Sequence, residues 1–135
     1  MVKSSLLLDA SAIIALFRKE PGYEEVRRAL SGRACHVSSV TLAEMEGRLV
    51  GRGEYTHGQV QASWTKLAPF VPEVVFDSDC RAKAAVYYAR KSPYGLSLGD
   101  AACFGTAEVH GLGVLTAEQN WATVPDLPFG VEVIR

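Results

Sequence analysis

The chain has 135 residues, the length of one ordinary domain, and at that size roughly two-thirds of the unfolded surface can be buried on folding. Its 48% hydrophobic and 21% charged residues argue against an intrinsically disordered or fibrous protein. With 14 basic and 15 acidic residues the net charge is −1, which excludes a strong overall attraction to a polyanion. We expect a single domain spanning residues 1–135.

The apolar stretches of the sequence are short. Leu6–Leu8 and Ala12–Phe17 fall far below the roughly 20 residues that a membrane-spanning helix needs. Residues 1–5 carry one lysine, and Asp9 interrupts the apolar stretch after them, which is atypical of a secretory signal peptide. We therefore expect no membrane association and a cytoplasmic location.

The cysteines and histidines lack the spacing of a disulfide framework or a zinc site. Cys35, Cys80 and Cys103 are odd in number, far apart and without a C-x-x-C pair, so we expect buried thiols in a reducing compartment. The basic residues gather in segments 27–33, 48–52 and 81–91. Such clusters most often belong to solvated helix faces, and a local nucleic-acid patch is the alternative.

The first half of the chain alternates short apolar segments with helical patterns. The expected elements are a strand over Leu6–Leu8, a helix capped by Ser11 and running to about Arg18, a helix over Tyr23–Leu30, a strand over Cys35–Val37, a helix from about Thr41 to Arg52 and a helix from about Thr56 to Leu67. Glycine and proline punctuate these elements at Pro21-Gly22 and Gly51-Arg52-Gly53, as expected of residues that end helices.

The second half continues the alternation. The expected elements are a strand within Val71–Phe76 centred on Val74-Val75-Phe76, a helix from Asp77 to about Lys91 with Ala82, Ala85, Val86 and Ala89 on its buried side, a loop at Pro93–Gly95, a helix over Ser97–His110, and strands over Val114–Thr116 and Val131–Ile134. Pro72 makes the start of the third strand an edge or entry position. This order predicts an α/β fold with three layers, α/β/α, and a mostly parallel central sheet of four to five strands.

Four acidic residues occupy positions that suit a shared site. Ligands of open parallel sheets lie beyond the carboxyl ends of the strands. Asp9, Glu44 and Glu118 follow predicted strands, and Asp100 opens its own helix.

Four carboxylates that converge need a counter-ion. At about 5 Å and an effective dielectric constant of about 20, each ionised pair repels by roughly 3 kcal/mol. Several such pairs would consume much of a net stability of roughly 5–15 kcal/mol. A hard divalent cation such as Mg²⁺ removes this cost, retains several waters, and points to phosphodiester hydrolysis with one metal or two.

The spacing of the acids also suits purely local roles. Thr41–Glu44 and Ser97–Asp100 both match the capping box, in which the acid bonds to the start of its own helix. Asp9 could likewise cap the helix that follows it. Periodicity also leaves Glu46 as an alternative to Glu44 as the acid that points inward.

Four segments together resemble the PIN-domain ribonucleases, and most closely the VapC-type toxins of toxin–antitoxin pairs. The segments are Leu6–Ala12, Ser39–Glu44, Leu96–Ala101 and Val114–Trp121. Each is a weak motif alone, but their order and spacing over nearly the whole chain make the combined resemblance specific. It implies a PIN-like domain and a metal-dependent endoribonuclease that cuts RNA.

The resemblance also assigns roles. It implies that Asp9, Glu44 and Asp100 coordinate Mg²⁺ or Mn²⁺ and orient the attacking water, and it selects Glu44 over Glu46. By the same resemblance, the hydroxyls of Thr116 and Ser11 support the site.

The fourth acid departs from the family pattern. Glu118 stands where the family usually has aspartate, and its side chain is one methylene longer. We expect Glu118 to reach the metal directly or through a water, with the neutral oxygen of Asn120 as the alternative.

The resemblance further implies a homodimer and a cognate antitoxin whose C-terminal segment lies over the acidic cleft, often offering an arginine to it. Apolar side chains on the first helix, Ile13, Leu16 and Phe17, suit such contacts. We expect Ile13 to belong to the core, and Phe17 is left open between core and surface.

Two other functions compete. A PIN-fold module that binds RNA or protein without turnover is motivated by Glu118. A phosphatase or phosphotransferase with Asp9 as nucleophile is the other, although Ser11 replaces the second aspartate that such folds carry and no catalytic lysine is evident. The RNA target cannot be deduced from the sequence, because hydrolysis at a phosphate requires no base contact.

Overall fold

A parallel β-sheet forms the centre of the protein, for which a computed structural model describes residues 5–135. The expectation about a signal peptide concerns mainly residues 1–4, which lie outside the described residues. The sheet has five strands in the order β3-β2-β1-β4-β5, and every neighbouring pair is parallel. The strands are β1 (Leu6–Leu8), β2 (Cys35–Ser38), β3 (Glu73–Val74), β4 (Gly113–Thr116) and β5 (Val131–Val133).

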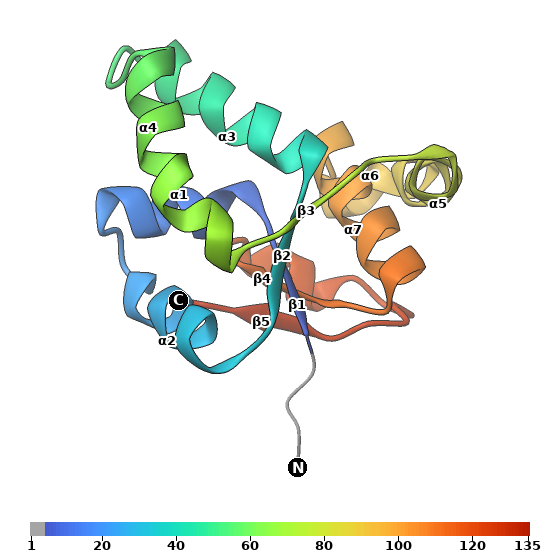
Figure 1. The fold of residues 1–135 in the computed structure, drawn as a ribbon. Helices are drawn as coiled ribbons and strands as arrows, with labels where there is room; N and C mark the ends of the chain where they lie inside the picture. Colours follow the sequence, from blue (N-terminus) through green and yellow to red (C-terminus); the bar gives the residue numbers. More distant parts are fainter. Residues whose placement is uncertain (1–4) are drawn as a thin grey trace.

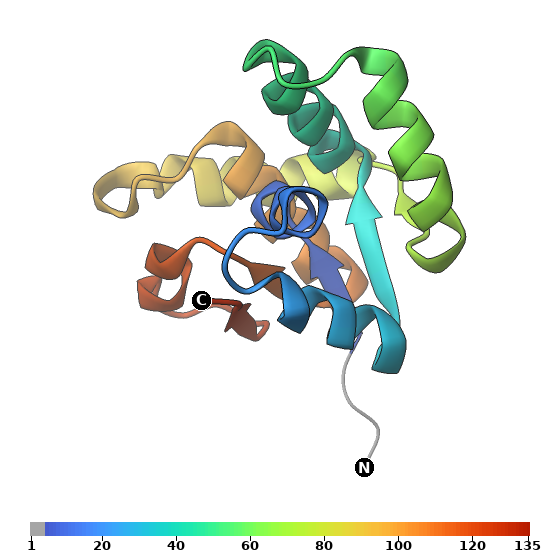
Figure 2. The ribbon, with the colours of Figure 1, turned by 90° about the vertical axis from the view of Figure 1, so that its left-hand side faces the viewer.

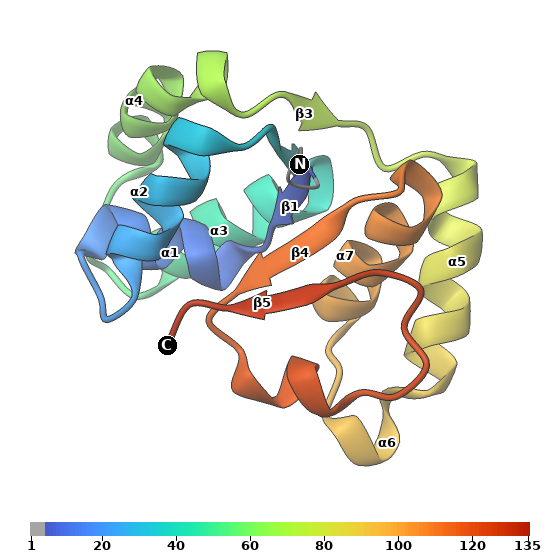
Figure 3. The same cartoon turned by 90° about the horizontal axis from the view of Figure 1, so that it is seen from below.

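Helices cover both faces of the sheet, as the alternating sequence pattern predicts (Figures 1 and 3). The α-helices are α1 (Ala10–Arg18), α2 (Tyr23–Gly32), α3 (Ser39–Gly51), α4 (His57–Leu67), α5 (Ser78–Ala89), α6 (Lys91–Tyr94) and α7 (Leu98–His110), and the short 3-10 helices are η1 (Ala68–Phe70) and η2 (Gln119–Thr123). Helices α1 to α4 lie on one side of the sheet and α5 and α7 on the other, so the three-layer α/β/α prediction is confirmed.

Alternation along the central strands divides the core in two. Leu6 and Leu8 of β1 pack with α1 to α4, whereas Leu7 between them packs with α7, Tyr87 of α5 and Trp121 of η2. Successive side chains of a strand point to opposite faces, so a fully apolar β1 is what a strand covered on both faces requires. Every residue of β1 is at most 2% exposed.

The carboxyl ends of the strands point toward the start of α1 and α3. Figure 2 shows β2 leading into the pair formed by α3 and α4, which stands above this edge of the sheet. Strands β2 and β4 pair with opposite edges of β1. The chain therefore adds strands on one side of β1 first and on the other side from β4 onward. Open α/β sheets bind ligands at such a switch point.

Two helix starts differ from the sequence prediction. Asp9, the predicted alternative to Ser11, caps α1 by accepting a hydrogen bond from the backbone N–H of Ala12. Helix α3 begins at Ser39 and is capped by Ser38, whose hydroxyl accepts from the N–H of Val40. The capping box considered at Thr41–Glu44 is therefore absent, because those residues already lie inside the helix.

Strand β3 is shorter than predicted. Its ladder with β2 holds two residue pairs, Val37 with Glu73 and Ser38 with Val74. Ser38 then leaves the sheet to cap α3, so β2 offers no further backbone groups to Val75, which is 69% exposed. The edge position predicted from Pro72 is confirmed by the strand order.

The buried face of α5 was predicted wrongly. Ala82, Ala85, Val86 and Ala89 are exposed, and the helix instead buries Cys80, Ala84 and Tyr87. The reason is the close approach of α7, where an added Cβ at Gly105 would lie 2.5 Å from the backbone nitrogen of Ala84.

The segment predicted as a loop at Pro93–Gly95 contains the end of the short helix α6. The cysteines are free and buried, as predicted. Among residues 5–135, no helix is long and apolar enough to cross a membrane.

Candidate active site at the carboxyl edge of the sheet

The four acids singled out in the sequence, here termed the acidic cluster (Asp9, Glu44, Asp100 and Glu118), come from four separate segments at this edge. Asp9 follows β1, Glu44 lies in the second turn of α3, Asp100 is in the first turn of α7, and Glu118 follows β4. Strands β2, β1 and β4 are adjacent, so the segments that follow them start side by side.

Asp9 is held by a network of hydroxyl groups. The Ser11 hydroxyl donates to Oδ1 at 2.8 Å, and the Thr116 hydroxyl donates to Oδ2 at 2.8 Å. Ser11 in turn accepts from the N–H of Ala117, and Thr116 accepts from the N–H of Glu118. The orientation of Asp9 is thus fixed by the segment after β4.

Burial makes the ionised form of Asp9 costly. The side chain is 5% exposed. Desolvation raises the pKa of Asp9 from 3.8 to about 7, against the lowering effect of its hydrogen bonds, and the charge on Glu118 adds to the rise. A cation close to Asp9 would remove this cost.

Glu44 lies between two helices. Its Oε2 accepts from the Arg48 guanidinium at 2.6 Å, one turn along α3. An added Cβ at Gly99 would lie 2.7 Å from Oε1, so the carboxylate rests against the start of α7. Burial raises the pKa of Glu44, Arg48 lowers it, and the charges on Asp100 and Glu118 raise it.

The alternative acid, Glu46, is directed elsewhere. Its Oε2 lies 2.7 Å from Nδ1 of His57 and 3.4 Å from the amide of Gln61, both on α4.

The remaining members of the acidic cluster have local partners. Asp100 forms a capping box with Ser97: it accepts from the Ser97 N–H at 2.9 Å, and Ser97 accepts from the Asp100 N–H. Glu118 precedes η2 and is partly exposed. The amide of Asn120 donates to the carbonyl of Tyr94 at 3.0 Å, so it ties η2 to α6.

The acids of the cluster nevertheless act electrostatically on a common neighbour. The pKa of the fully buried Cys103 thiol is raised first by desolvation and then by the charges on Asp9, Asp100 and Glu44. Within residues 5–135, however, no three acidic, histidine or cysteine side chains stand in position to hold one metal ion. Each carboxylate is held in a partly local arrangement. The cluster can therefore share one metal ion only if the side chain of Glu44, Asp100 or Glu118 rotates.

Three residues of the site were not identified in advance. Arg48 is predicted only as part of a basic segment, although its spacing of four from Glu44 is the signal for a helical ion pair. Gly99 and Cys103 carry no signal in one sequence, because their roles arise from contacts between α3, α7 and β1.

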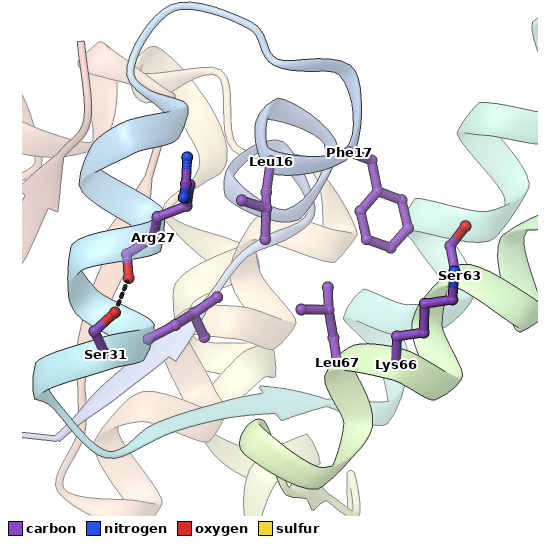
Figure 4. A pocket seen from close by; sticks show the side chains of 8 residues that line it. Leu16, Phe17, Arg27, Ser31, Ser63, Lys66 and Leu67 are labelled. Carbon is purple, nitrogen blue, oxygen red and sulfur yellow. Dashed lines mark hydrogen bonds between the residues drawn. The ribbon is translucent and has the colours of Figure 1, made fainter.

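A separate apolar groove of about 480 Å³ lies away from the acidic cluster, between α1, α2 and α4. Figure 4 shows Leu16, Phe17 and Leu67 directed into it, with Arg27 and Lys66 at its margins. Ile13 is 1% exposed and belongs to the core, as predicted.

Comparisons with known proteins agree on the fold. Residues 6–127 match the family model described as PIN domain. A chain of a toxin-antitoxin complex from Klebsiella pneumoniae superposes with a TM-score of 0.68 at 22% identity, covering 96% of this chain and 98% of that one. VapBC2 from Rickettsia felis, bound to a DNA fragment from its promoter, superposes with a TM-score of 0.74 at 14% identity, covering 96% of this chain and 98% of that one. VapC20 from Mycobacterium tuberculosis, a Sarcin-Ricin loop cleaving toxin, superposes with a TM-score of 0.68 at 19% identity, covering 91% of this chain and 99% of that one. No curated protein matches the sequence significantly.

Proposed function

Since this chain belongs to the PIN domain family, we propose that it is a metal-dependent endoribonuclease that hydrolyses RNA phosphodiester bonds. We further propose that it is the toxin of a VapBC-type pair, that residues 1–135 form a single nuclease domain, and that it acts in the cytoplasm. Its structural neighbours include toxin–antitoxin complexes and an RNA-cleaving toxin, which supports this assignment.

The observation that carries the proposal is the burial of Asp9 beside the other carboxylates of the acidic cluster. Asp9 is nearly inaccessible to solvent; burial is the main cause that raises its pKa and that of Glu44, and the charges of other members of the cluster add to both rises. Oxygen donors of this kind fit Mg²⁺ or Mn²⁺ rather than softer ions. The carboxylate oxygens and the negative charge of the acidic cluster therefore both favour a divalent cation.

In this proposal Asp9, Glu44 and Asp100 hold the cation, with Glu118 as the fourth acid. With a divalent cation bound there, the carboxylates would be neutralised and the phosphodiester would be polarised. Ser11 and Thr116 keep Asp9 in one orientation through their hydroxyl hydrogen bonds. Asp9, Glu44 and Asp100 would also orient the attacking water. Glu118 would reach the cation directly or through a water, with Asn120 as the alternative oxygen.

A matched pair of substitutions on α3 tests the site. Glu44→Gln should abolish Mn²⁺-dependent cleavage of an RNA oligonucleotide, and Asp9→Asn and Asp100→Asn should do the same. Glu46→Gln makes the same chemical change two residues away, at a side chain that contacts His57 of α4. It should leave the rate of RNA cleavage within about twofold of wild type. Cleavage without a divalent cation, or full activity of Glu44→Gln, would exclude the proposal.

The second candidate is a PIN-fold module that binds RNA or protein without turnover. It is favoured by the capping box of Asp100, the ion pair of Glu44 and the glutamate at position 118. Single-turnover cleavage in the presence of Mn²⁺ separates the two candidates, because a binding module retains RNA in a filter-binding assay but yields no product.

The groove between α1, α2 and α4 supports the proposed antitoxin contact. Leu16 and Phe17 supply an apolar floor, and the exposed side chains of Arg27 and Lys66 supply positive charge. An antitoxin segment with an apolar residue beside acidic ones would fit this surface. Leu16→Asp should abolish co-purification with the product of the neighbouring reading frame and leave RNA cleavage intact.

The exposed face of α5 supports the proposed homodimer. Ala82, Ala85, Val86 and Ala89 form an apolar stripe at helical spacing, and Val86 is 56% exposed. An exposed apolar stripe of this kind suits contact with a second copy of the chain. Light scattering should give the mass of two chains for the wild type and of one chain for Val86→Glu.

A further inference from the structure

Arg48 is a basic side chain in direct contact with the acidic cluster. Its Nη2 lies 2.6 Å from Oε2 of Glu44, and its side chain is 37% exposed against 23% for Glu44. An isolated i,i+4 pair on a helix surface contributes little to stability. This pair differs from a surface pair because its acid also feels the charges of Asp100 and Glu118.

The two partners differ in their freedom to move. The carboxylate of Glu44 rests against the start of α7, where an added Cβ at Gly99 would lie 2.7 Å from Oε1. Arg48 is the more exposed partner and has a long, flexible stem, so it can swing away from Glu44 toward solvent.

An RNA phosphate that approaches the acidic cluster meets like charge. The net charge of −1 supplies no compensating attraction over the whole chain. A guanidinium presents donors in a planar fork that matches two phosphate oxygens. Arg48 carries such a group at the margin of the cluster.

We propose that Arg48 is a positioning residue that exchanges partners: it pairs with Glu44 in the metal-free protein and with an RNA phosphate once Glu44 has become a metal ligand. This inference rests on the proposed nuclease function. Arg48 thereby offsets the charge of Glu44 before loading and recruits the substrate afterwards.

The first measurement is calorimetric titration with MnCl₂ in the absence of RNA. Arg48→Gln removes the competing cation and should tighten Mn²⁺ binding about tenfold. Arg52→Gln makes the same charge change one turn further along and should stay within about twofold of wild type, because solvent screens charges at that distance. Arg48→Lys retains the charge and should stay near the wild-type affinity.

The second measurement is RNA cleavage at saturating Mn²⁺. Arg48→Gln should raise KM about tenfold with a much smaller change in kcat, whereas Arg48→Lys should recover most of the loss. An ion pair that only holds Glu44 would leave KM unchanged, and a change in either the Mn²⁺ affinity or KM alone would overturn the exchange. If the wild type binds no Mn²⁺, the proposed function and this inference fall together; if it binds Mn²⁺ and cuts RNA but Arg48→Gln behaves identically, only the inference falls.

Discussion

Replacing Asp9 by asparagine removes a carboxylate that is 5% exposed and keeps the shape of the side chain. The asparagine oxygen can still accept from the N–H of Ala12 and the hydroxyl of Ser11. Its amide can donate to the hydroxyl of Thr116, which lies 3.3 Å from that of Ser11 and can turn to donate there. The variant therefore loses charge and keeps the hydrogen bonds to Ala12, Ser11 and Thr116.

The size of the effect follows from the pKa of Asp9. Its rise from 3.8 to about 7 means that the folded protein retains a proton that the unfolded chain releases near pH 4. The free energy of unfolding of the metal-free wild type therefore falls as the pH rises from about 4 to about 7. At about 1.4 kcal/mol per pH unit the upper limit is about 4 kcal/mol, and we expect Asp9→Asn to be about 2 kcal/mol more stable at pH 8.

Urea denaturation in EDTA at several pH values measures this difference. The two proteins should agree within about 1 kcal/mol near pH 3.5 and separate as the pH rises to about 7. Adding Mn²⁺ should stabilise the wild type and leave Asp9→Asn unchanged, because binding to the folded state raises stability. A variant that is less stable than wild type at pH 8, or a difference that does not depend on pH, would refute the reasoning.

Glycine substitutions provide further predictions. Gly105→Ala should destabilise the protein by about 1–3 kcal/mol in urea, because the new Cβ would lie 2.5 Å from the backbone nitrogen of Ala84. Gly47→Ala, inside α3 with nothing within 4 Å of the new Cβ, is the matched control and should be stabilising by up to about 1 kcal/mol. Gly99→Ala should weaken Mn²⁺ binding in calorimetry while the urea midpoint stays close to wild type, because its Cβ would displace the carboxylate of Glu44. Unchanged Mn²⁺ affinity would show that Glu44 is not held where the metal binds.

Most of the architecture could be predicted because it depends on local patterns. The run Leu6–Leu8, buried on both faces, and the helical periodicity around it specify a covered parallel strand. The positions of Asp9 and Glu118 directly after strands place them at the carboxyl edge once the strands are parallel. The PIN-domain resemblance, found from the order of four weak motifs, is confirmed by the family model.

The error at α5 concerns a contact between distant segments. Periodicity marked Ala82, Ala85, Val86 and Ala89 as buried, but it cannot tell which apolar stripe of α5 faces a neighbour. The face with Ala84 is buried because Gly105 of α7 lets the two backbones approach.

The sequence by itself determined the order of elements, the parallel sheet and the segments that carry the four acids, because these follow from the alternation of apolar runs, helical patterns and turn residues. Only the tertiary structure decided which distant groups each acid meets: the Thr116 hydroxyl for Asp9, and the start of α7 with the charges of Asp100 and Glu118 for Glu44. The physical reason is that a carboxylate's pKa and orientation depend on burial and on charges a few ångströms away, and most of these neighbours come from segments distant in the chain.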